Sequence, residues 1–304
     1  MPPSDAHERT LPRTPASNRD HVRATLAVVA EMTERRRVVH VDGSSVDGNR
    51  VVERPDTLAV EEPLEIRVAG RSVSVTMRTP GHDLDLALGF LLTEGVVTKP
   101  DEIVEAIACG DNVVDVATTD AAAARVVERR FYTSSSCGLC GKESVDAVRT
   151  RSPYDVSTDG VVVAPAVLTA LPHRLREAQR VFERTGGLHA AGLFTAAGEL
   201  LCLREDVGRH NAVDKIVGWA LQQDRLPLTG CVLQVSGRAS FELVQKATLA
   251  GVPMLAAVSA PSSLAVALAE ETGMTLVGFL RGESFNVYTR PDRITSCPSC
   301  PERR

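Results

Sequence analysis

The 304-residue sequence has the composition of an ordinary globular protein, with 43% hydrophobic and 24% charged residues. Its 34 Lys and Arg residues against 39 Asp and Glu residues give a formal net charge of −5. This balance excludes a collagen, a coiled-coil rod and a wholly disordered chain, and it gives no reason to expect nucleic-acid binding. At about 100–200 residues per domain, two domains are expected.

The cysteines and the polar first residues favour a cytoplasmic protein. Seven cysteines are an odd number, which does not suit a closed disulfide framework. Residues 1–23 are rich in Pro, Arg, Asp and His and lack the pattern of a signal peptide. Residues 247–269 carry no charge, but two prolines and three serines interrupt them. We therefore expect a buried strand, a turn and a helix there, and no membrane span.

The first part of the chain is expected to be a polar arm followed by a small domain. Residues 1–44 are predicted to be disordered or partly helical, with one short helix at residues 23–33. Residues 45–152 are predicted to form a mixed α+β domain that begins with a β-hairpin. The expected strands of this domain are residues 64–68, 73–77 and 113–117, and the expected helix is residues 84–91.

The second part alternates between strands and helices, which predicts a layered α/β domain at residues 153–292. It is expected to begin with a linker at residues 153–172 that contains a strand at 161–163, and a tail follows at residues 293–304. The other expected strands are residues 190–195, 200–204, 232–235, 254–258, 276–280 and 285–288. The expected helices are residues 175–184, 212–221, 241–250 and 264–272.

A C-x-x-C pair, Cys137 and Cys140, lies in a segment rich in serine and glycine, which predicts an accessible loop. A free thiol with a pKa of about 8.5 is only slightly ionised at neutral pH. Lys142 and the start of a helix expected at residues 143–149 would favour the reactive thiolate. The pair therefore indicates sulfur chemistry, and the alternatives are half of a zinc site or two unreactive buried thiols.

A second pair, Cys297 and Cys300, lies among prolines and arginines near the end of the sequence. The two pairs together could ligate zinc, but 156 residues separate Cys140 from Cys297, against the ~12–20 residues usual in zinc ribbons and fingers. We expect a loose tail and no metal site. Three single cysteines at positions 109, 202 and 231 lie in or near apolar strands, and packing explains them.

The segment 204–215 joins a predicted strand to a predicted helix and is unusually polar. Arg209 and His210 stand at the expected start of the helix, where they could hold an anionic group. The alternative is a capping loop made of salt bridges.

Two further polar loops also follow predicted strands. Ser236, Gly237 and Arg238 open one predicted helix, and Gly237 would let the backbone approach a phosphate, although a plain turn with a cap is an alternative. Residues 281–284 follow the strand at 276–280. Because ligands gather at the carboxyl ends of strands in open α/β sheets, the loops at positions 204, 236, 259 and 281 are expected to converge on a polyphosphate ligand. The alternative is four unrelated surface turns.

Several motifs in a fixed order together resemble one family. They are Thr79-Pro80-Gly81, Leu88-Gly89-Phe90-Leu91, Glu94-Gly95, Ser136-Cys137-Gly138-Leu139-Cys140-Gly141, Thr185-Gly186-Gly187-Leu188-His189-Ala190-Ala191, Glu205-Asp206-Val207-Gly208-Arg209-His210-Asn211-Ala212, Ser236-Gly237-Arg238 and Phe279-Leu280-Arg281-Gly282. Over about residues 50–295, this order resembles the formate dehydrogenase accessory sulfurtransferases (FdhD).

The resemblance implies a homodimeric sulfurtransferase that takes persulfide sulfur from a cysteine desulfurase. The sulfur would pass to the bis(molybdopterin guanine dinucleotide) molybdenum cofactor that formate dehydrogenase needs. Cys137 would carry the persulfide, and Cys140 would assist or receive it. The cofactor, or a guanine nucleotide in its place, would bind Phe279, Leu280, Arg281, Gly282, Glu283 and Ser284. The loops with Ser236, Gly237, Arg238, Arg209 and His210 would complete that site.

The resemblance also implies that the C-terminal half is similar to the cytidine deaminase fold. Deaminase chemistry itself is not expected, because His189 is not followed by the glutamate of the H-x-E motif. Two other functions remain open at this point. One is a cofactor-binding chaperone whose cysteines are structural or hold zinc. The other is a thiol–disulfide oxidoreductase, which the lack of a thioredoxin-like β-α-β context disfavours.

Overall fold

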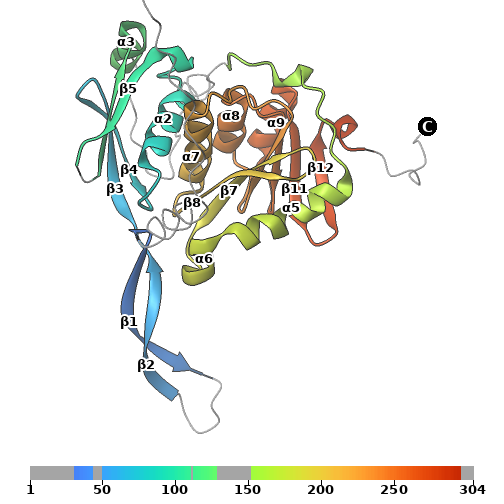
Figure 1. The fold of residues 1–304 in the computed structure, drawn as a ribbon. Helices are drawn as coiled ribbons and strands as arrows, with labels where there is room; N and C mark the ends of the chain where they lie inside the picture. Colours follow the sequence, from blue (N-terminus) through green and yellow to red (C-terminus); the bar gives the residue numbers. More distant parts are fainter. Residues whose placement is uncertain (1–30, 44–49, 111, 129–151, 296–304) are drawn as a thin grey trace, which may run out of the picture.

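The computed structural model describes residues 31–43, 50–110, 112–128 and 152–295. In this part of the chain the strands form a six-stranded sheet, a four-stranded sheet and a two-stranded arm (Figure 1). The protein is therefore mixed α/β, as predicted. The C-x-x-C loop and the second cysteine pair lie outside the described residues.

The four-stranded sheet has the order β4-β3-β6-β5, and the predicted hairpin is its antiparallel β3–β4 pair. The helix α2 (Asp83–Thr93) follows this hairpin as expected. Two elements were not predicted, β5 and the helix α3 (Asp120–Glu128), which forms from the alanine-rich segment. The strands are β3 (Glu62–Val68), β4 (Arg71–Arg78), β5 (Ile103–Ala108) and β6 (Val113–Thr118).

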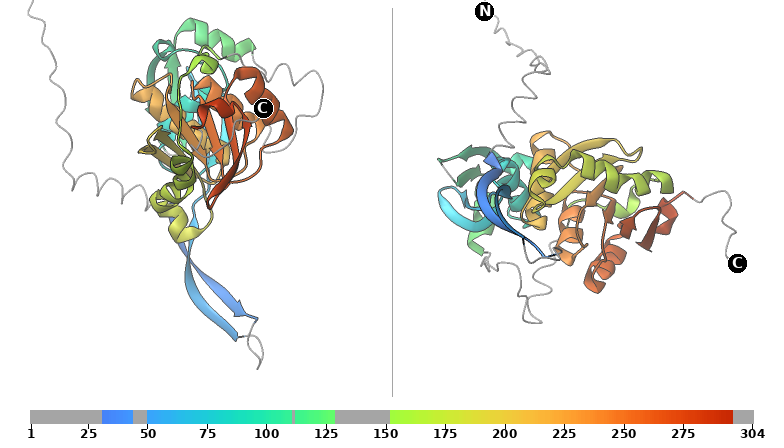
Figure 2. Two further views of the ribbon diagram at one scale, coloured as in Figure 1. Left: turned by 90° about the vertical axis from the view of Figure 1, so that its right-hand side faces the viewer. Right: turned by 90° about the horizontal axis from the view of Figure 1, so that it is seen from below.

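The arm is an antiparallel ribbon of β1 (Thr33–Asp42) and β2 (Arg50–Ala59), and it projects from the body in Figure 1 and in the left view of Figure 2. The expectation of a disordered or partly helical segment was therefore wrong for residues 33–42. Val39, Val41 and Val51 of the arm are all more than half exposed. A ribbon open on both faces lacks the alternation of buried and exposed residues that marks a strand in a sequence.

The six-stranded sheet has the order β12-β11-β10-β9-β7-β8, and its strands and following helices agree with the predicted alternation. The strands are β7 (His189–Thr195), β8 (Leu200–Asp206), β9 (Cys231–Val235), β10 (Met254–Ala257), β11 (Thr275–Arg281) and β12 (Ser284–Thr289). The helices α7 (Arg209–Gln222), α8 (Phe241–Leu249) and α9 (Ser263–Thr272) pack on one face. The helix α5 (Pro165–Ala178) packs on the other, and the short α6 (Arg180–Thr185) follows it (Figure 1).

The helix α5 corrects the prediction of a linker at residues 153–172. It begins at Pro165, a favourable first position for proline, but Pro172 inside the helix had argued against helical structure. The strand predicted at 161–163 is reduced to one isolated bridge between Val163 and Ile294.

One hydrophobic cluster joins both sheets, because α2 of the first part packs against α7 of the second. The crossing occurs at two glycines: a Cβ on Gly89 would overlap the backbone oxygen of Asp214, and a Cβ on Gly218 would overlap that of Asp85. The two helices therefore meet backbone to backbone. A domain boundary at residue 152 stays a prediction.

Candidate functional site

The carboxyl ends of four strands meet at one edge of the six-stranded sheet. Strands β9, β10 and β11 are parallel, and β8 runs in the same direction because both β8 and β9 are antiparallel to β7. The loops after β8, β9 and β10 lead into α7, α8 and α9, so three helices begin at this edge. We call it the carboxyl edge.

Backbone hydrogen bonds link the loops of the carboxyl edge to one another. The Ala190 N–H donates to Ser236 Oγ at 2.9 Å, which joins β7 to the loop after β9. The Ser259 N–H donates to the Gly237 carbonyl at 3.3 Å, and the Phe279 N–H donates to the Ser259 carbonyl at 3.1 Å. The predicted convergence of the loops at positions 204, 236, 259 and 281 on one edge is therefore what the structure contains.

Three arginines at the carboxyl edge form no ion pair with any residue that the structure describes: Arg209, Arg238 and Arg281. Arg238 and Arg281 are exposed, and the Arg281 guanidinium lies 5.6 Å from the centroid of the Phe279 ring. The Arg209 Nε is shielded from solvent and has no hydrogen-bond partner in the described part of the chain. These arginines therefore have no ion-pair partner in the described part of the chain, while Glu242 in the first turn of α8 and Glu283 beside Arg281 bring negative charge to the same edge.

The helix starts add to the positive charge of the three arginines. The first N–H groups of a helix lack partners within it and carry the positive end of its dipole. No side chain caps α7 at Gly208 or α8 at Ser240, whereas Ser262 caps α9. The uncapped starts of α7 and α8 are thus suited to an anion held by the neighbouring arginines.

Arg204 does not belong to this positive group, although its loop reaches the edge. Its guanidinium binds Asp85 of α2 through two nitrogens, at 2.8 and 2.7 Å. Gln222 donates to the other Asp85 oxygen at 2.5 Å. Arg204 therefore fastens β8 to α2.

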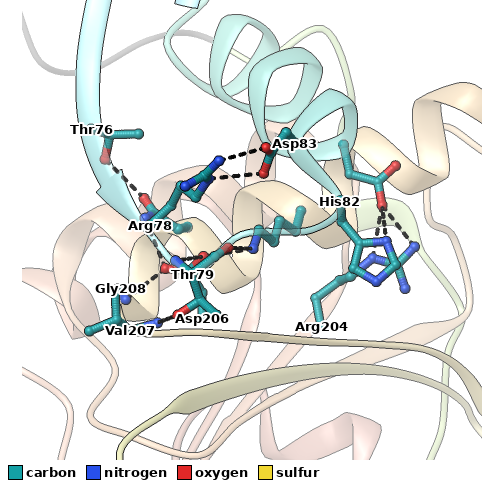
Figure 3. A network of polar contacts seen from close by, with 12 residues as sticks. Thr76, Arg78, Thr79, His82, Asp83, Arg204, Asp206, Val207 and Gly208 are labelled. Atoms are coloured by element: carbon teal, nitrogen blue, oxygen red, sulfur yellow. Dashed lines mark hydrogen bonds and ion pairs between the residues drawn. The ribbon is translucent and has the colours of Figure 1, made fainter. Parts of the chain in front are cut away.

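Most of the polar segment 204–215 turns inward and joins the two sheets (Figure 3). Lys215 Nζ lies 2.7 Å from Asp206 Oδ2, and both side chains are fully buried. Thr79 contacts both groups: its N–H donates to Asp206 at 3.2 Å, and its carbonyl accepts from Lys215 at 2.8 Å. Asn211 donates to the Met77 carbonyl at 2.8 Å. The alternative of a salt-bridged loop therefore describes Arg204, Asp206 and Lys215, whereas the role of Arg209 and His210 in holding an anion stays a prediction.

A second buried network lies beside the first. Lys246 Nζ is 2.9 Å from Asp214 Oδ1, and Thr93 Oγ1 donates to the same Asp214 oxygen at 2.7 Å. Glu94, at the end of α2, also pairs with Lys246 at 3.3 Å. These charges therefore neutralise one another and connect α2, α7 and α8.

His210, next to Arg209, faces the start of α8. Its Nε2 lies 3.4 Å from Ser240 Oγ and 3.9 Å from Glu242 Oε2. Burial, reinforced by the positive charges of Arg209 and Lys246, lowers the pKa of His210 to about 4. This imidazole is therefore neutral at physiological pH.

His189 was not predicted as a site residue, because a lone histidine at the start of a strand gives no chemical signal. It pairs with Asp206 across β7 and β8, and its Nδ1 lies 3.6 Å from the place that a Cβ on Gly237 would occupy. Burial and the Arg209 charge lower the pKa of His189, against the opposing effect of Asp206. A second histidine with a lowered pKa thus lies opposite Asp206 and near Gly237 of the loop after β9.

The stretch expected to bind the cofactor forms the turn between β11 and β12. Phe279 has a left-handed φ of 52° at an irregularity in the β11–β12 pairing, and Gly282 has a φ of 59°. The Leu280 side chain is fully buried in the core, so only its backbone is available to a ligand. The exposed residues of the turn are Arg281, Gly282, Glu283 and Ser284.

The described cysteines differ in their suitability for sulfur chemistry. Burial raises the pKa of Cys202 to about 12 and also raises the pKa of Cys231, so both thiols resist ionisation. Cys202 is buried as expected, whereas Cys109 is exposed, and packing does not explain its position.

No group of three His, Cys, Asp or Glu residues in the described ranges could hold a metal ion. None of the described helices is long and apolar enough to span a membrane.

Comparisons with known proteins agree with the motif order. The model of the FdhD/NarQ family matches residues 59–295. A sulfur carrier protein FdhD from Mycolicibacterium paratuberculosis is 57% identical over 276 residues, covering 87% of this chain and 99% of the relative. One from Sulfolobus acidocaldarius is 47% identical over 240 residues, covering 79% of this chain and 91% of the relative.

A solved structure is also similar. It is the crystal structure of a protein from Desulfotalea psychrophila described as a formate dehydrogenase accessory protein. It has a TM-score of 0.69 and 26% sequence identity, covering 87% of this chain and all of the other. On the match over residues 59–295 and the identity to its relatives, the chain belongs to the FdhD/NarQ family.

Proposed function

We propose that this protein is a sulfur carrier that delivers persulfide sulfur from Cys137 to the bis(molybdopterin guanine dinucleotide) molybdenum cofactor for formate dehydrogenase. The observation that carries the proposal is that three arginines without an ion-pair partner in the described part of the chain and two uncapped helix starts lie along the carboxyl edge. Close relatives named sulfur carrier protein FdhD support the transfer of sulfur.

The first step would be an exchange between persulfides. A cysteine desulfurase persulfide loses its outer sulfur to the Cys137 thiolate, so one S–S bond breaks and one forms without net oxidation. The attacking group must be a thiolate, and the raised pKa values of Cys202 and Cys231 make these two cysteines unsuitable. Cys140 would assist Cys137 or receive the sulfur.

The acceptor would bind at the carboxyl edge through its diphosphates. Arg209 and Arg238 would contact phosphate oxygens beside the starts of α7 and α8. Ser236 would offer its hydroxyl and Gly237 its backbone N–H to the same ligand, since the Ser236 N–H already donates to the Ala190 carbonyl. Arg281 with the exposed turn at 282–284 would contact the far part of the ligand. A guanine nucleotide has the same diphosphate and base, so it would occupy part of this site.

The proposal includes a homodimer in the cytoplasm and a C-terminal half similar to the cytidine deaminase fold. The mixed six-stranded sheet, with helices on both faces, supports that similarity. The partners would be a cysteine desulfurase and formate dehydrogenase.

The proposal is tested by activating formate dehydrogenase in a strain that lacks its own sulfur carrier. Wild-type protein should restore formate oxidation, and Cys137→Ala should lose at least about 100-fold in activity, because sulfur transfer would require a thiolate at this position. Cys109→Ala is the matched control and should act like wild type, since Cys109 is exposed but distant in sequence from the pair. Full activity of a soluble Cys137→Ala variant would contradict the proposal.

A further inference from the structure

The arm of β1 and β2 projects from the body of the protein, and only its base packs there, through Met32 and Ala59 against residues of α6 (Figure 1). Eight of the ten residues of β1 are exposed, and Val39 and Val41 are among them. Two antiparallel strands without a third strand are only marginally stable in water. The arm would therefore gain stability from a further strand, and its two edges differ in their ability to accept one.

The register of the ribbon shows which backbone groups point out of it. The Val60 N–H donates to the Met32 carbonyl at 3.0 Å, and these residues continue the register that pairs Thr33 with Ala59. Because hydrogen-bonded and non-hydrogen-bonded pairs alternate along antiparallel strands, the even-numbered residues of β1 bond to β2. The N–H and carbonyl groups of the odd-numbered residues therefore point away from the ribbon on both strands.

The edge of β2 is interrupted in its middle, whereas the edge of β1 is open. Pro55 is one of the outward-facing residues of β2, and proline has no N–H to offer to a further strand. Four outward-facing residues of β1 each carry an N–H, and none of these groups donates to a described residue outside the arm. They are Arg35, Arg37, Val39 and Val41. A further strand would therefore add to β1.

The charges of β1 are complementary to a second copy of the same strand. Two copies can pair antiparallel about a two-fold axis, so that one surface complements itself. Centred on Val39, this pairing places Arg36 opposite Asp42 of the second copy, and the symmetry repeats the contact. Opposite charges across two strands stabilise their pairing, and like charges oppose it. No residues of like charge stand opposite each other in this register.

The neighbouring registers are less favourable. In a pairing centred on position 37, Arg37 would stand opposite itself. In one centred on position 38, Glu34 would stand opposite Asp42 at both ends. In one centred on position 40, His40 would stand opposite itself, and the strands would overlap only over residues 38–42. The charge pattern therefore favours the register centred on Val39.

We propose that the free edge of β1 is the contact between two copies of this chain, which pair antiparallel with Val39 on the two-fold axis. The inference rests on the homodimer of the proposed function and assigns the contact that holds it together. The two arms then form a four-stranded sheet in the order β2-β1-β1-β2. This sheet brings the two Val39 side chains together and gives each ribbon the further strands that it lacks.

The first test is the dissociation constant of the dimer of the full chain, measured by analytical ultracentrifugation over a range of concentrations. Val39→Pro removes the N–H that each copy donates to the other on the axis, but this N–H points away from β2, so the ribbon keeps its bonds. Loss of these two hydrogen bonds should raise the dissociation constant by about 30-fold. Val51→Pro is the matched control, because Val51 is equally exposed, at 61%, and its N–H points outward at the other edge.

A second test does not depend on a proline variant that folds. Val39→Cys should give a disulfide-linked dimer on mild oxidation, because opposite Cα atoms of a hydrogen-bonded pair are about 5.5 Å apart, within the range of disulfides. Val41→Cys is the control on the same strand, because position 41 would stand opposite Arg37 of the second copy. The two Cys side chains would then lie four residues apart along the strands, about 13 Å, and should not link.

The outcomes separate the contact from the rest of the proposed function. A wild-type chain that stays monomeric at every concentration would overturn both the β1 contact and the homodimer. A dimer that Val39→Pro does not weaken, or a Val41→Cys variant that links as readily as Val39→Cys, would overturn the β1 contact alone. Sulfur transfer is measured separately through Cys137→Ala, so its failure would be distinguishable from each of these results.

Discussion

Gly89 of α2 lies so close to Asp214 of α7 that a side chain at position 89 would overlap the Asp214 carbonyl oxygen. Gly218 has the same relationship to Asp85, so each helix contributes one glycine to the crossing. This contact fixes α7, whose first residue is Arg209, against α2, the helix that follows the β3–β4 hairpin. The position of the carboxyl edge therefore depends on two glycines that contact no ligand.

Gly89→Ala should destabilise the protein by at least about 2 kcal/mol, because backbone atoms cannot move aside as the end of a side chain can. Urea unfolding measures the change. Gly160→Ala is the control, since no atom lies within 4 Å of a Cβ at that position and its φ is not left-handed. Equal stability of the two variants would show that α2 and α7 do not pack this closely.

Asp206→Asn should cost about 3–5 kcal/mol of unfolding free energy, because it leaves the fully buried Lys215 ammonium without its counter-charge. The matched control is Glu34→Gln, which breaks the exposed Arg36–Glu34 pair on the arm and should cost less than about 1 kcal/mol. A cost below about 1 kcal/mol for Asp206→Asn would mean that the buried pair does not hold the two sheets together.

Stability should decrease as pH falls below about 6.5, in part because of His82. Burial, with the charges of Arg204 and Lys215 adding, lowers its pKa to about 3. Between these two pH values the unfolded chain binds a proton at His82 that the folded protein excludes, so acid favours unfolding. His82 also has a left-handed φ of 59°, which asparagine tolerates better than most residues.

His82→Asn should therefore reduce the loss of stability between about pH 7.5 and 5 while leaving the helix start intact. Urea unfolding of both proteins at the two pH values gives the comparison. Identical pH dependence of wild type and variant would show that His82 is not held neutral by the fold.

Replacing any one of the three edge arginines should weaken binding of a guanine dinucleotide. Arg209→Gln, Arg238→Gln and Arg281→Gln each remove a charged hydrogen-bond donor worth about 1.5–3 kcal/mol, which is about 10- to 150-fold in the dissociation constant. Arg71→Gln is the control, because Arg71 lies exposed at the hairpin of the other sheet. If Arg71→Gln weakened binding as much, attraction would be general and no site at the carboxyl edge would be needed.

The sequence was most informative where strands and helices are buried. The apolar strands of the six-stranded sheet are short, continuous and bounded by polar turns, so their positions along the chain and the edge where their loops meet could be predicted. The arm could not, because its valines are exposed on a ribbon that packs on no core. The helix α5 was missed because Pro172 inside it argues for a linker.

The sequence predicted that several polar loops lie at one edge of the sheet, but not which of their side chains are buried. In segment 204–215, Arg209 and His210 face the edge, whereas Asp206 and Lys215 point into the protein. All are polar, and the sequence cannot distinguish a ligand contact from a buried ion pair that is hydrogen-bonded to a residue more than 100 positions away, as the Asp206–Lys215 pair is to Thr79. His189 was missed because its neighbours are brought to it by β8 and β9.

Intact-protein mass spectrometry after incubation with a cysteine desulfurase and free cysteine shows whether Cys137 carries the sulfur. Wild type should gain the mass of one sulfur atom, and a reductant should remove it. Cys137→Ala should gain none, whereas Cys109→Ala should gain as much as wild type. A wild-type protein that gains no sulfur, or a Cys137→Ala variant that gains it in full, would contradict the role of Cys137 as the sulfur carrier.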